Sequence, residues 1–211
     1  MSDVDIVERR LIDEWDLFVE RGEISRDVPA AIAASRGESI TRVVVWAELE
    51  DVRLAVAELH AALDEDGARA DLLATSRWSV KDVVAHLAAW AGEFRREIEA
   101  VARREAFDYS ITFVPRIGPT DWNAREHDRR RDIPLDALFR EFDAETAGLQ
   151  DLALSLPDDV LFAVAELPQT PDGTAANRWR RRPADLMLMK CWHDRYHIGR
   201  LHQILDVDVE G

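Results

Sequence analysis

The stretch PADLMLMKCWHDRYHIGRLHQIL, residues 183–205, has the pattern of a single long helix, and the rest of the chain is organised around it. Pro183 suits the first helical position, because the N–H that proline lacks would be unpaired there anyway. After Pro183, Gly199 is the one glycine or proline in this stretch, and a helix tolerates a glycine at a cost of about 1 kcal/mol. His193 and His197 are four residues apart, so their rings are expected on one face, one turn apart.

The helix face that carries the two histidines is the apolar one. Leu186, Met189 and Ile204 fall on the same stripe, which predicts that both imidazoles point into the core. Two imidazoles in a core are unfavourable unless something satisfies their nitrogen atoms. A divalent metal ion does so, and it needs further ligands from elsewhere in the chain.

Length and composition predict a globular protein. The chain has 211 residues, of which 47% are hydrophobic and 33% charged, a balance typical of folded domains. Residues 1–37 are predicted to form an N-terminal helical extension, and residues 38–206 the main domain. The net charge of −15 repels phosphate backbones, so nucleic acid is not an expected partner. The arginine clusters at 129–131 and 178–182 are interpreted as solvated surface, although one could hold a small anion.

The cysteine content and the N-terminal sequence bear on the cellular location. Cys191 is the single cysteine, so no intrachain disulfide can form, and a reducing cytoplasm is the expected setting. The N-terminus is acidic and lacks the basic and apolar regions of a signal peptide. No stretch is apolar for long enough to span a bilayer, so we expect no membrane partner.

Hydrophobic spacing predicts four long helices that pack as an all-α four-helix bundle. Ser39 is the expected N-cap of the first long helix, which ends at residues 64–67. Ser79 with Asp82 resembles a capping box at the start of the second helix, and Pro134 begins the third. In each helix, apolar residues recur at alternating spacings of four and three, which is the pattern of a bundle seam.

Two long connections rich in proline and glycine are expected as loops, at 107–131 and 157–182. No alternation long enough to predict a strand occurs in the chain. The first connection contains Trp122 and Asn123, a large aromatic residue and an amide over the mouth of the bundle. Either these residues line a binding site, or Trp122 only plugs the end of the core.

His86 supplies a third histidine, because it flanks the seam of the second helix together with Trp90. Three neutral imidazoles with one position left open are the ligand set of a catalytic metal site. Zn²⁺ and Ni²⁺ both accept imidazole, and affinity order does not choose between them. His127 and His202 are lower-ranked candidates, because His127 is expected to be solvated and His202 to lie at the surface. His60 is interpreted as a surface or partly buried histidine.

Two carboxylates are candidates for proton transfer or for support of the site. Glu145 interrupts the apolar seam of the third helix. Either it accepts a proton near the histidines, or the helix is rotated so that Glu145 faces out and Thr146 faces in. Asp194 stands in a His-Asp-x-x-His pattern, one methylene short of the zinc-protease pattern His-Glu-x-x-His. A protease is disfavoured, because aspartate is shorter and little chain follows to supply the usual third ligand.

Three other residues lie near the histidines in the sequence. Cys191 is interpreted as a small buried hydrophobe rather than a ligand. Arg195 and Arg200 could each bind an anionic group beside the site, or they form exposed salt bridges.

Three motifs resemble the DinB-like superfamily of four-helix-bundle proteins, and most closely its ClbS/DfsB-type branch. They are WSVKDVVAHLAAW at 78–90, Trp122-Asn123, and HDRYHIGRL at 193–201. The resemblance runs from about Ser39 to Leu205, and the first part of the chain lies outside it. It implies that His86, His193 and His197 correspond to the metal triad of the superfamily.

The resemblance also implies a range of activities. The superfamily includes metal-dependent enzymes that use low-molecular-weight thiols, such as mycothiol- or bacillithiol-dependent transferases and maleylpyruvate isomerase. The ClbS-type branch is associated with self-protection against a reactive cyclopropane-bearing metabolite, by hydrolytic opening. The N-terminal extension departs from the pattern of the superfamily.

The leading hypothesis is an enzyme that acts on a small reactive electrophile by thiol transfer or hydrolysis. A divalent metal, with a low-molecular-weight thiol for transfer, would be the cofactor. Trp90, Trp122, Asn123 and Arg200 are predicted to contact the small-molecule substrate.

A second hypothesis is a metal-free bundle that sequesters a small molecule without turnover. A third is a structural protein whose histidines only hydrogen-bond in the core. The sequence leaves the substrate open, and a homodimer is one assembly it allows.

Overall fold

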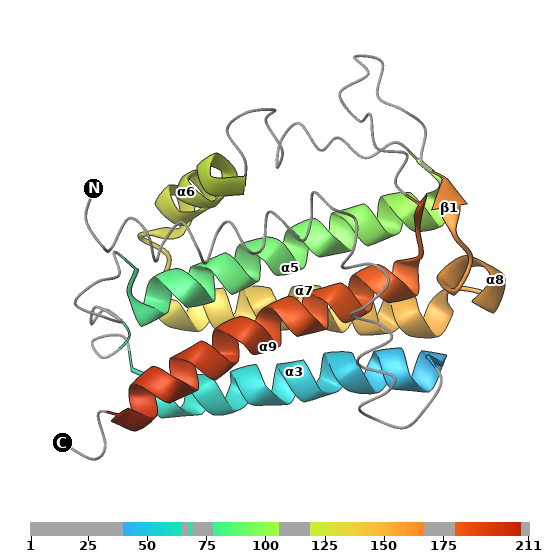
Figure 1. Cartoon of the computed structure of the whole chain (residues 1–211). Helices are drawn as coiled ribbons and strands as arrows, with labels where there is room; N and C mark the ends of the chain where they lie inside the picture. The colour runs from blue at the N-terminus through green and yellow to red at the C-terminus, as the bar shows by residue number, and fades with distance from the viewer. Residues whose placement is uncertain (1–39, 65–67, 69–77, 106–118, 167–179, 208–211) are drawn as a thin grey trace, which may run out of the picture.

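The computed structural model describes residues 40–64, 68, 78–105, 119–166 and 180–207. Four long helices lie side by side in it (Figure 1). They are α3 (Arg42–Ala62), α5 (Val80–Arg103), α7 (Leu135–Ser155) and α9 (Pro183–Val207). The predicted all-α bundle is therefore confirmed. The extension predicted at 1–37 lies outside the described residues, so the domain boundary stays a prediction.

Each long helix packs extensively against two of the other three. α3 and α5 both contact α7 and α9, which places α3 and α5 at opposite corners of the bundle. α3 and α9 run in one direction, and α5 and α7 run in the other (Figure 1). α5 and α9, which carry the three predicted histidines, are therefore antiparallel neighbours.

The core is made of large aliphatic and aromatic side chains from all four long helices. Members that are at most 3% exposed include Leu49, Val52, Leu87, Phe94, Ile98, Leu138, Phe142, Leu149, Leu186, Met187 and Leu188. Burial of one such side chain contributes about 1.5–3 kcal/mol relative to leaving it in water. The helix faces with apolar spacings of four and three are thus the faces that meet in the core.

Local sequence signals set the beginnings of three helices. At α5 the predicted capping box is present, because Ser79 Oγ accepts from the Asp82 N–H at 3.2 Å and Asp82 Oδ2 accepts from the Ser79 N–H at 2.7 Å. α7 begins directly after Pro134, as predicted. α9 begins at Pro183, where a missing N–H has no helical cost.

The structure corrects one predicted helix start and decides one open question about a helix face. The N-cap of α3 is Thr41, whose hydroxyl accepts from the Val44 N–H at 3.3 Å. The predicted cap, Ser39, lies outside the described residues, and the helix starts beyond it. In α7 the fully buried seam residue is Thr146, whereas Glu145 is half-buried. The rotated helix is thus the interpretation that holds.

Both connections that were expected as loops contain short elements. The first holds α6 (Pro119–Arg130), and the second holds α8 (Asp158–Leu161), β1 (Ala165–Glu166) and β2 (Arg180–Arg181). The two strands pair antiparallel. The prediction of loops missed α6 because its residues are almost all polar, so no apolar stripe marks it. Strands of two residues carry no alternation that a sequence pattern could detect.

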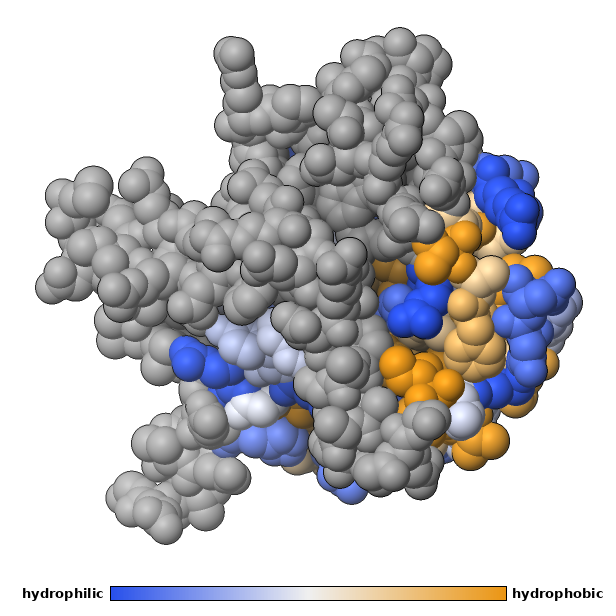
Figure 2. Space-filling view, turned by 45° about the vertical axis from the view of Figure 1, so that its right-hand side comes forward, coloured by the Kyte–Doolittle hydropathy of each residue, from blue (hydrophilic) through white to orange (hydrophobic). Residues whose placement is uncertain are grey.

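The described surface mixes polar and apolar side chains. Figure 2 shows hydrophobic and hydrophilic residues next to one another on the face that it presents. Val43 and Leu54 on α3 and Leu154 on α7 are among the exposed large hydrophobic residues. Among the described helices, none is long and apolar enough to cross a membrane.

Candidate metal centre

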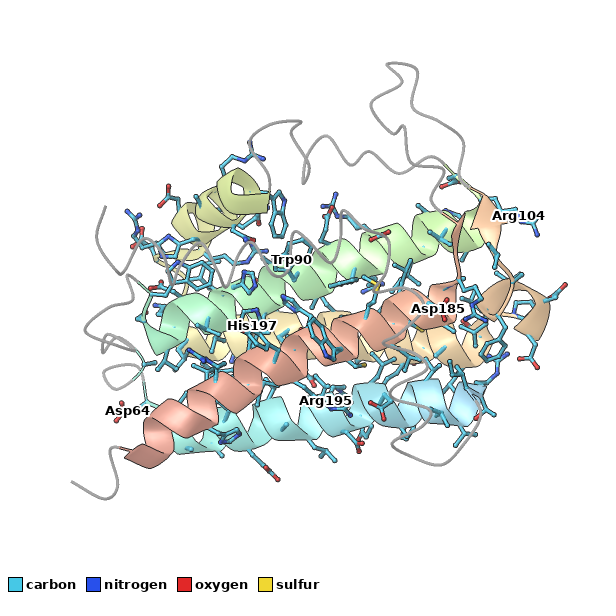
Figure 3. The ribbon with its side chains drawn as sticks, viewed as in Figure 1. Asp64, Trp90, Arg104, Asp185, Arg195 and His197 are labelled. Atoms are coloured by element: carbon cyan, nitrogen blue, oxygen red, sulfur yellow. The ribbon has the colours of Figure 1, made fainter. Side chains whose placement is uncertain are left out.

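Three histidines from two helices come together between α5 and α9. His86 lies on α5, while His193 and His197 share one face of α9, which packs against α5. One nitrogen from each ring can be chosen so that all three lie within 4.8 Å of one another. The ring centroid of His197 is 4.7 Å from that of each other histidine. Figure 3 shows His197 on α9, on the side where that helix faces α5.

The protein environment keeps two of these histidines neutral. Burial is the main cause that lowers the pKa of His86 well below its usual value, and the neighbouring His197 and His193 add to it. Burial likewise lowers the pKa of His197, followed by the effects of His193 and of the Arg200 charge. A neutral imidazole keeps a lone pair on one ring nitrogen, which is the form that binds a metal ion.

A buried carboxylate orients the third histidine. His193 Nδ1 donates to Asp194 Oδ1 at 2.9 Å, and Asp194 has no exposed surface. With the proton on Nδ1, the Nε2 lone pair of His193 is left to face the other two rings. Histidine ligands in metal sites usually have such a carboxylate partner, which fixes the tautomer and the ring orientation. Asp194 Oδ2 in turn forms an ion pair with Lys190, a residue that the sequence analysis did not single out.

Two of the three rings already have the spacing of ligands on a divalent metal ion. A tetrahedral zinc ion with zinc–nitrogen bonds of about 2.0–2.1 Å holds its ligand nitrogens roughly 3.3 Å apart. The Nε2 atoms of His86 and His193 are separated by 3.2 Å. Three neutral nitrogen donors also leave a fourth position for a small molecule, which is the arrangement of catalytic rather than structural sites.

Aromatic side chains form a wall beside the histidines. The ring centroid of Trp90 is 5.8 Å from that of His193 and 4.6 Å from that of Trp122. Trp122 is buried, and it comes from α6 rather than from a loop. The Trp90 indole N–H donates to Asn123 Oδ1 at 3.0 Å. Trp122 thus closes the core and extends the wall, while Asn123 fixes the orientation of Trp90.

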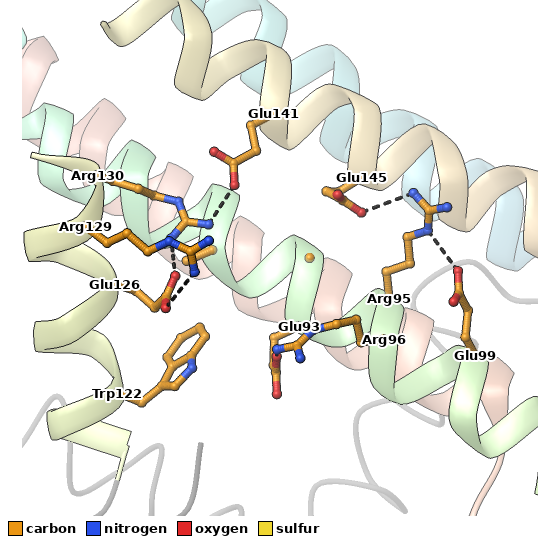
Figure 4. Close-up of a pocket in the computed structure, with 12 residues that line it drawn as sticks. Glu93, Arg95, Arg96, Glu99, Trp122, Glu126, Arg129, Arg130, Glu141 and Glu145 are labelled. Atoms are coloured by element: carbon orange, nitrogen blue, oxygen red, sulfur yellow. Dashed lines mark hydrogen bonds and ion pairs between the residues drawn. The ribbon is translucent and has the colours of Figure 1, made fainter. Parts of the chain in front are cut away.

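Glu145 lies in a different place from the histidines. Its carboxylate accepts a hydrogen bond from Arg95 at 3.2 Å. Both residues line a polar pocket of about 630 Å³ that also contains Trp122, Arg130 and Glu141 (Figure 4). The pocket is bounded by α5, α6 and α7, whereas the histidines lie between α5 and α9. The hypothesis that Glu145 accepts a proton near the histidines is therefore not supported by its contacts.

The other three histidines of the chain do not join the triad. His127 was expected to be solvated, but its Nε2 lies 2.8 Å from Asp82 Oδ1, which ties α6 to the start of α5. His60 is partly exposed, as predicted, and pairs with Asp136 at 3.0 Å. His202 is exposed at the end of α9, also as predicted.

Arg195, Arg200 and Cys191, which lie near the triad in the sequence, differ in their burial and in their partners. Arg195 pairs with the buried Glu48, which confirms the salt-bridge interpretation. Arg200 is exposed, and its charge reaches His197. Cys191 is a buried hydrophobe, as predicted, and burial raises the pKa of its thiol to about 12. The thiol of this chain is therefore inert at neutral pH.

A four-helix bundle with three histidines converging from adjacent helices belongs to the class of bundles that can bind a metal in their interior. Residues 49–189 match the family model described as the mycothiol maleylpyruvate isomerase N-terminal domain. The chain belongs to this family, a DinB-like superfamily domain whose members bind divalent metals. The match includes His86 and ends before His193. The narrower resemblance to the ClbS/DfsB-type branch stays a prediction. No curated protein and no solved structure matches the chain.

Proposed function

We propose that the protein is a metal-dependent enzyme that acts on a small reactive electrophile, by thiol transfer or by hydrolysis. The observation that carries this proposal is the convergence of His86, His193 and His197 with the Nδ1 of His193 occupied by the buried Asp194. A histidine cluster that served only to fill the core would not need a carboxylate to choose its tautomer. The family match supports the same direction, because DinB-like domains are often thiol-related enzymes.

In this proposal the three histidines hold the ion, and the surrounding residues prepare the site. A bound divalent ion would supply Lewis acidity, which lowers the pKa of a thiol or water molecule so that it becomes a nucleophile. Asp194 keeps His193 in the tautomer that a ligand requires. Trp90 and Trp122 offer apolar surface to the electrophile and exclude water on their side.

The charges around the site favour an anionic partner. The three imidazoles are neutral donors, and the charge of Asp194 is already balanced by Lys190. The double charge of an ion would therefore not be neutralised by its protein ligands, which favours a thiolate or hydroxide over a neutral molecule. Arg200, exposed beside His197, would attract an acidic group of the same small molecule.

The source of the nucleophile follows from the state of Cys191. Its thiol is buried and its pKa is raised to about 12, so it does not supply a thiolate. Thiol transfer would therefore need a low-molecular-weight thiol from solution, whereas hydrolysis would need only water. Electrophile consumption measured with and without added thiol separates these two reactions.

Elemental analysis of the full chain, purified without a tag, tests the proposal first. We expect a divalent metal near one per chain, lost in the His193→Ala/His197→Ala variant and kept in His202→Ala. His202 is a matched control, because it is an exposed histidine on the same helix. Absence of metal from the wild-type chain after reconstitution with Zn²⁺ and Ni²⁺ would contradict the proposal.

The second candidate function is metal-free sequestration of a small molecule. The contact between the Trp90 and Trp122 rings favours it, since an aromatic wall can bind an apolar ligand without any chemistry. It predicts that a candidate ligand quenches tryptophan fluorescence without being consumed. It also predicts that a chelator leaves this binding unchanged, whereas the enzyme proposal predicts loss of turnover.

A further inference from the structure

We propose that Lys190 is a positioning residue of the metal centre, whose ammonium keeps the carboxylate of Asp194 on His193 whether or not an ion is bound. This inference rests on the proposed function, because it gives Lys190 a role in forming the site before the metal arrives. Lys190 would act through Asp194 and His193, without contacting the ion or the substrate.

The first step is that the Lys190 side chain is fully buried and that its ammonium contacts other side chains of the core. Its side chain has no exposed surface. The ammonium Nζ lies 2.8 Å from Asp194 Oδ2, 2.6 Å from Thr146 Oγ1 and 4.3 Å from the centre of the Phe142 ring. The buried ammonium thus has a counter-charge, a hydrogen-bond acceptor and an aromatic ring around it. Lysine is almost never buried without such partners.

The second step is that Asp194 depends on this cation. Its Oδ1 accepts from His193, but its Oδ2 accepts no hydrogen bond within the described part of the chain and has the Lys190 ion pair. A carboxylate buried without a counter-charge is strongly disfavoured. Without Lys190, Asp194 would therefore leave its position or draw in water, and His193 would lose the partner that selects its tautomer.

The third step is that core packing alone does not call for a lysine at this position. The neighbours of Lys190 on α9, Leu188, Met189 and Cys191, are all buried and apolar. An apolar residue would fill this space without the cost of burying a charge. The lysine stands one helical turn before Asp194 and reaches Thr146 on α7, so it joins a third helix to the site. A role in holding Asp194 explains this arrangement.

The consequence is a testable difference between the metal-free and metal-loaded protein. An ion on His193 brings positive charge close to Asp194 and can replace part of what Lys190 provides. Loss of Lys190 should therefore disturb the metal-free protein more than the loaded one. A lysine that merely fills the core would affect both forms equally.

The experiment compares the full-length wild type, Lys190→Met and Lys190→Met/Asp194→Asn, each stripped by chelator and each with added Zn²⁺. Thermal unfolding gives the stability, and long-range ¹H–¹⁵N spectra of the imidazoles give the tautomer of His193. In the stripped Lys190→Met protein, we expect a midpoint about 10 °C lower and a mixture of tautomers. The double variant, which buries no unpaired charge, should recover part of the lost stability.

Zn²⁺ should raise the midpoint of Lys190→Met by several degrees more than that of the wild type, and should return His193 to a single tautomer. An equal Zn²⁺-induced rise in both proteins, with one tautomer throughout, would overturn the proposal. If neither Zn²⁺ nor Ni²⁺ had an effect on the wild type, the proposed function would be wrong. The tautomers of the stripped proteins would then decide by themselves whether Lys190 holds Asp194.

Discussion

Single side chains decide whether the histidine cluster can hold an ion. His193 is fixed by Asp194, and Trp90 is fixed by Asn123, each through one hydrogen bond. The three histidines were predictable from the sequence, because helical spacing on apolar faces brings them inward. Lys190 was not, since a lysine in an apolar run gives no sign of the partner that it reaches on another helix.

Asp194→Asn should weaken metal binding, and it should also lower the stability of the bundle, because the buried Lys190 loses its counter-charge. The amide can keep the contact to Nδ1 but not the charge that raises the basicity of the ring, so we expect the Kd for Zn²⁺ to rise about 10–100-fold. Competition with a chromophoric chelator measures this. Asp151→Asn is the matched control, because Asp151 is exposed on α7. An unchanged Kd for Asp194→Asn would mean that this carboxylate does not support a ligand.

The neutral state of His86 and His197 predicts how stability depends on pH. The pKa of both histidines is lowered in the folded protein, whereas the unfolded chain protonates histidines near pH 6.5. Between these values the unfolded state binds more protons, so the free energy of unfolding falls as the pH falls below about 6.5.

Urea unfolding of the chelator-treated protein between pH 7.5 and 5.5 measures this loss. We expect the wild type to lose about 1 kcal/mol more per histidine over the unit below pH 6.5 than His86→Gln/His197→Gln does. The comparison removes the effect of the many other titrating groups, which both proteins share. Parallel pH profiles would show that neither histidine is held neutral.

At the scale of elements, the sequence predicted the helices that have a periodic apolar face, and it did not predict the helix that lacks one. The four long helices were predictable because apolar seams recur along them and because Pro134, Pro183 and the Ser79–Asp82 capping box mark their starts. α6 was not, because its fit to the bundle depends on single long-range contacts. Trp122, Asn123 and His127 each join it to α5 or its side chains.

The contacts of α6 predict unequal effects of two substitutions. His127→Ala removes the bond to Asp82 Oδ1, which should cost about 1 kcal/mol and loosen α6 alone. Asp82→Ala removes that bond and the cap on the Ser79 N–H as well, so it should also destabilise α5. Hydrogen exchange resolved by segment tests this, with the exposed Arg129→Ala as control. Equal effects of the two substitutions on α5 would contradict the prediction.

At the scale of the whole molecule, the candidate metal centre joins segments that are far apart in the chain. His86 and His193 are 107 residues apart, and the ion pair of Lys190 with Asp194 is linked by Thr146 to α7. Each long helix packs against two others in one continuous core. Such a bundle should unfold as one cooperative unit, so that whatever stabilises the α5–α9 pair also stabilises α3 and α7.

Metal loading should therefore protect all four long helices equally. An ion that binds only the folded state, at a free concentration 100 times its Kd, slows exchange through global unfolding about 100-fold. We expect this factor for the slowest-exchanging amides of α3 and α7 as well as of α5 and α9, measured by hydrogen exchange with and without Zn²⁺. The His193→Ala/His197→Ala variant should show no change. Protection confined to α5 and α9 would instead mean that these two helices open as a separate unit, because a ligand suppresses only those opening reactions that release it.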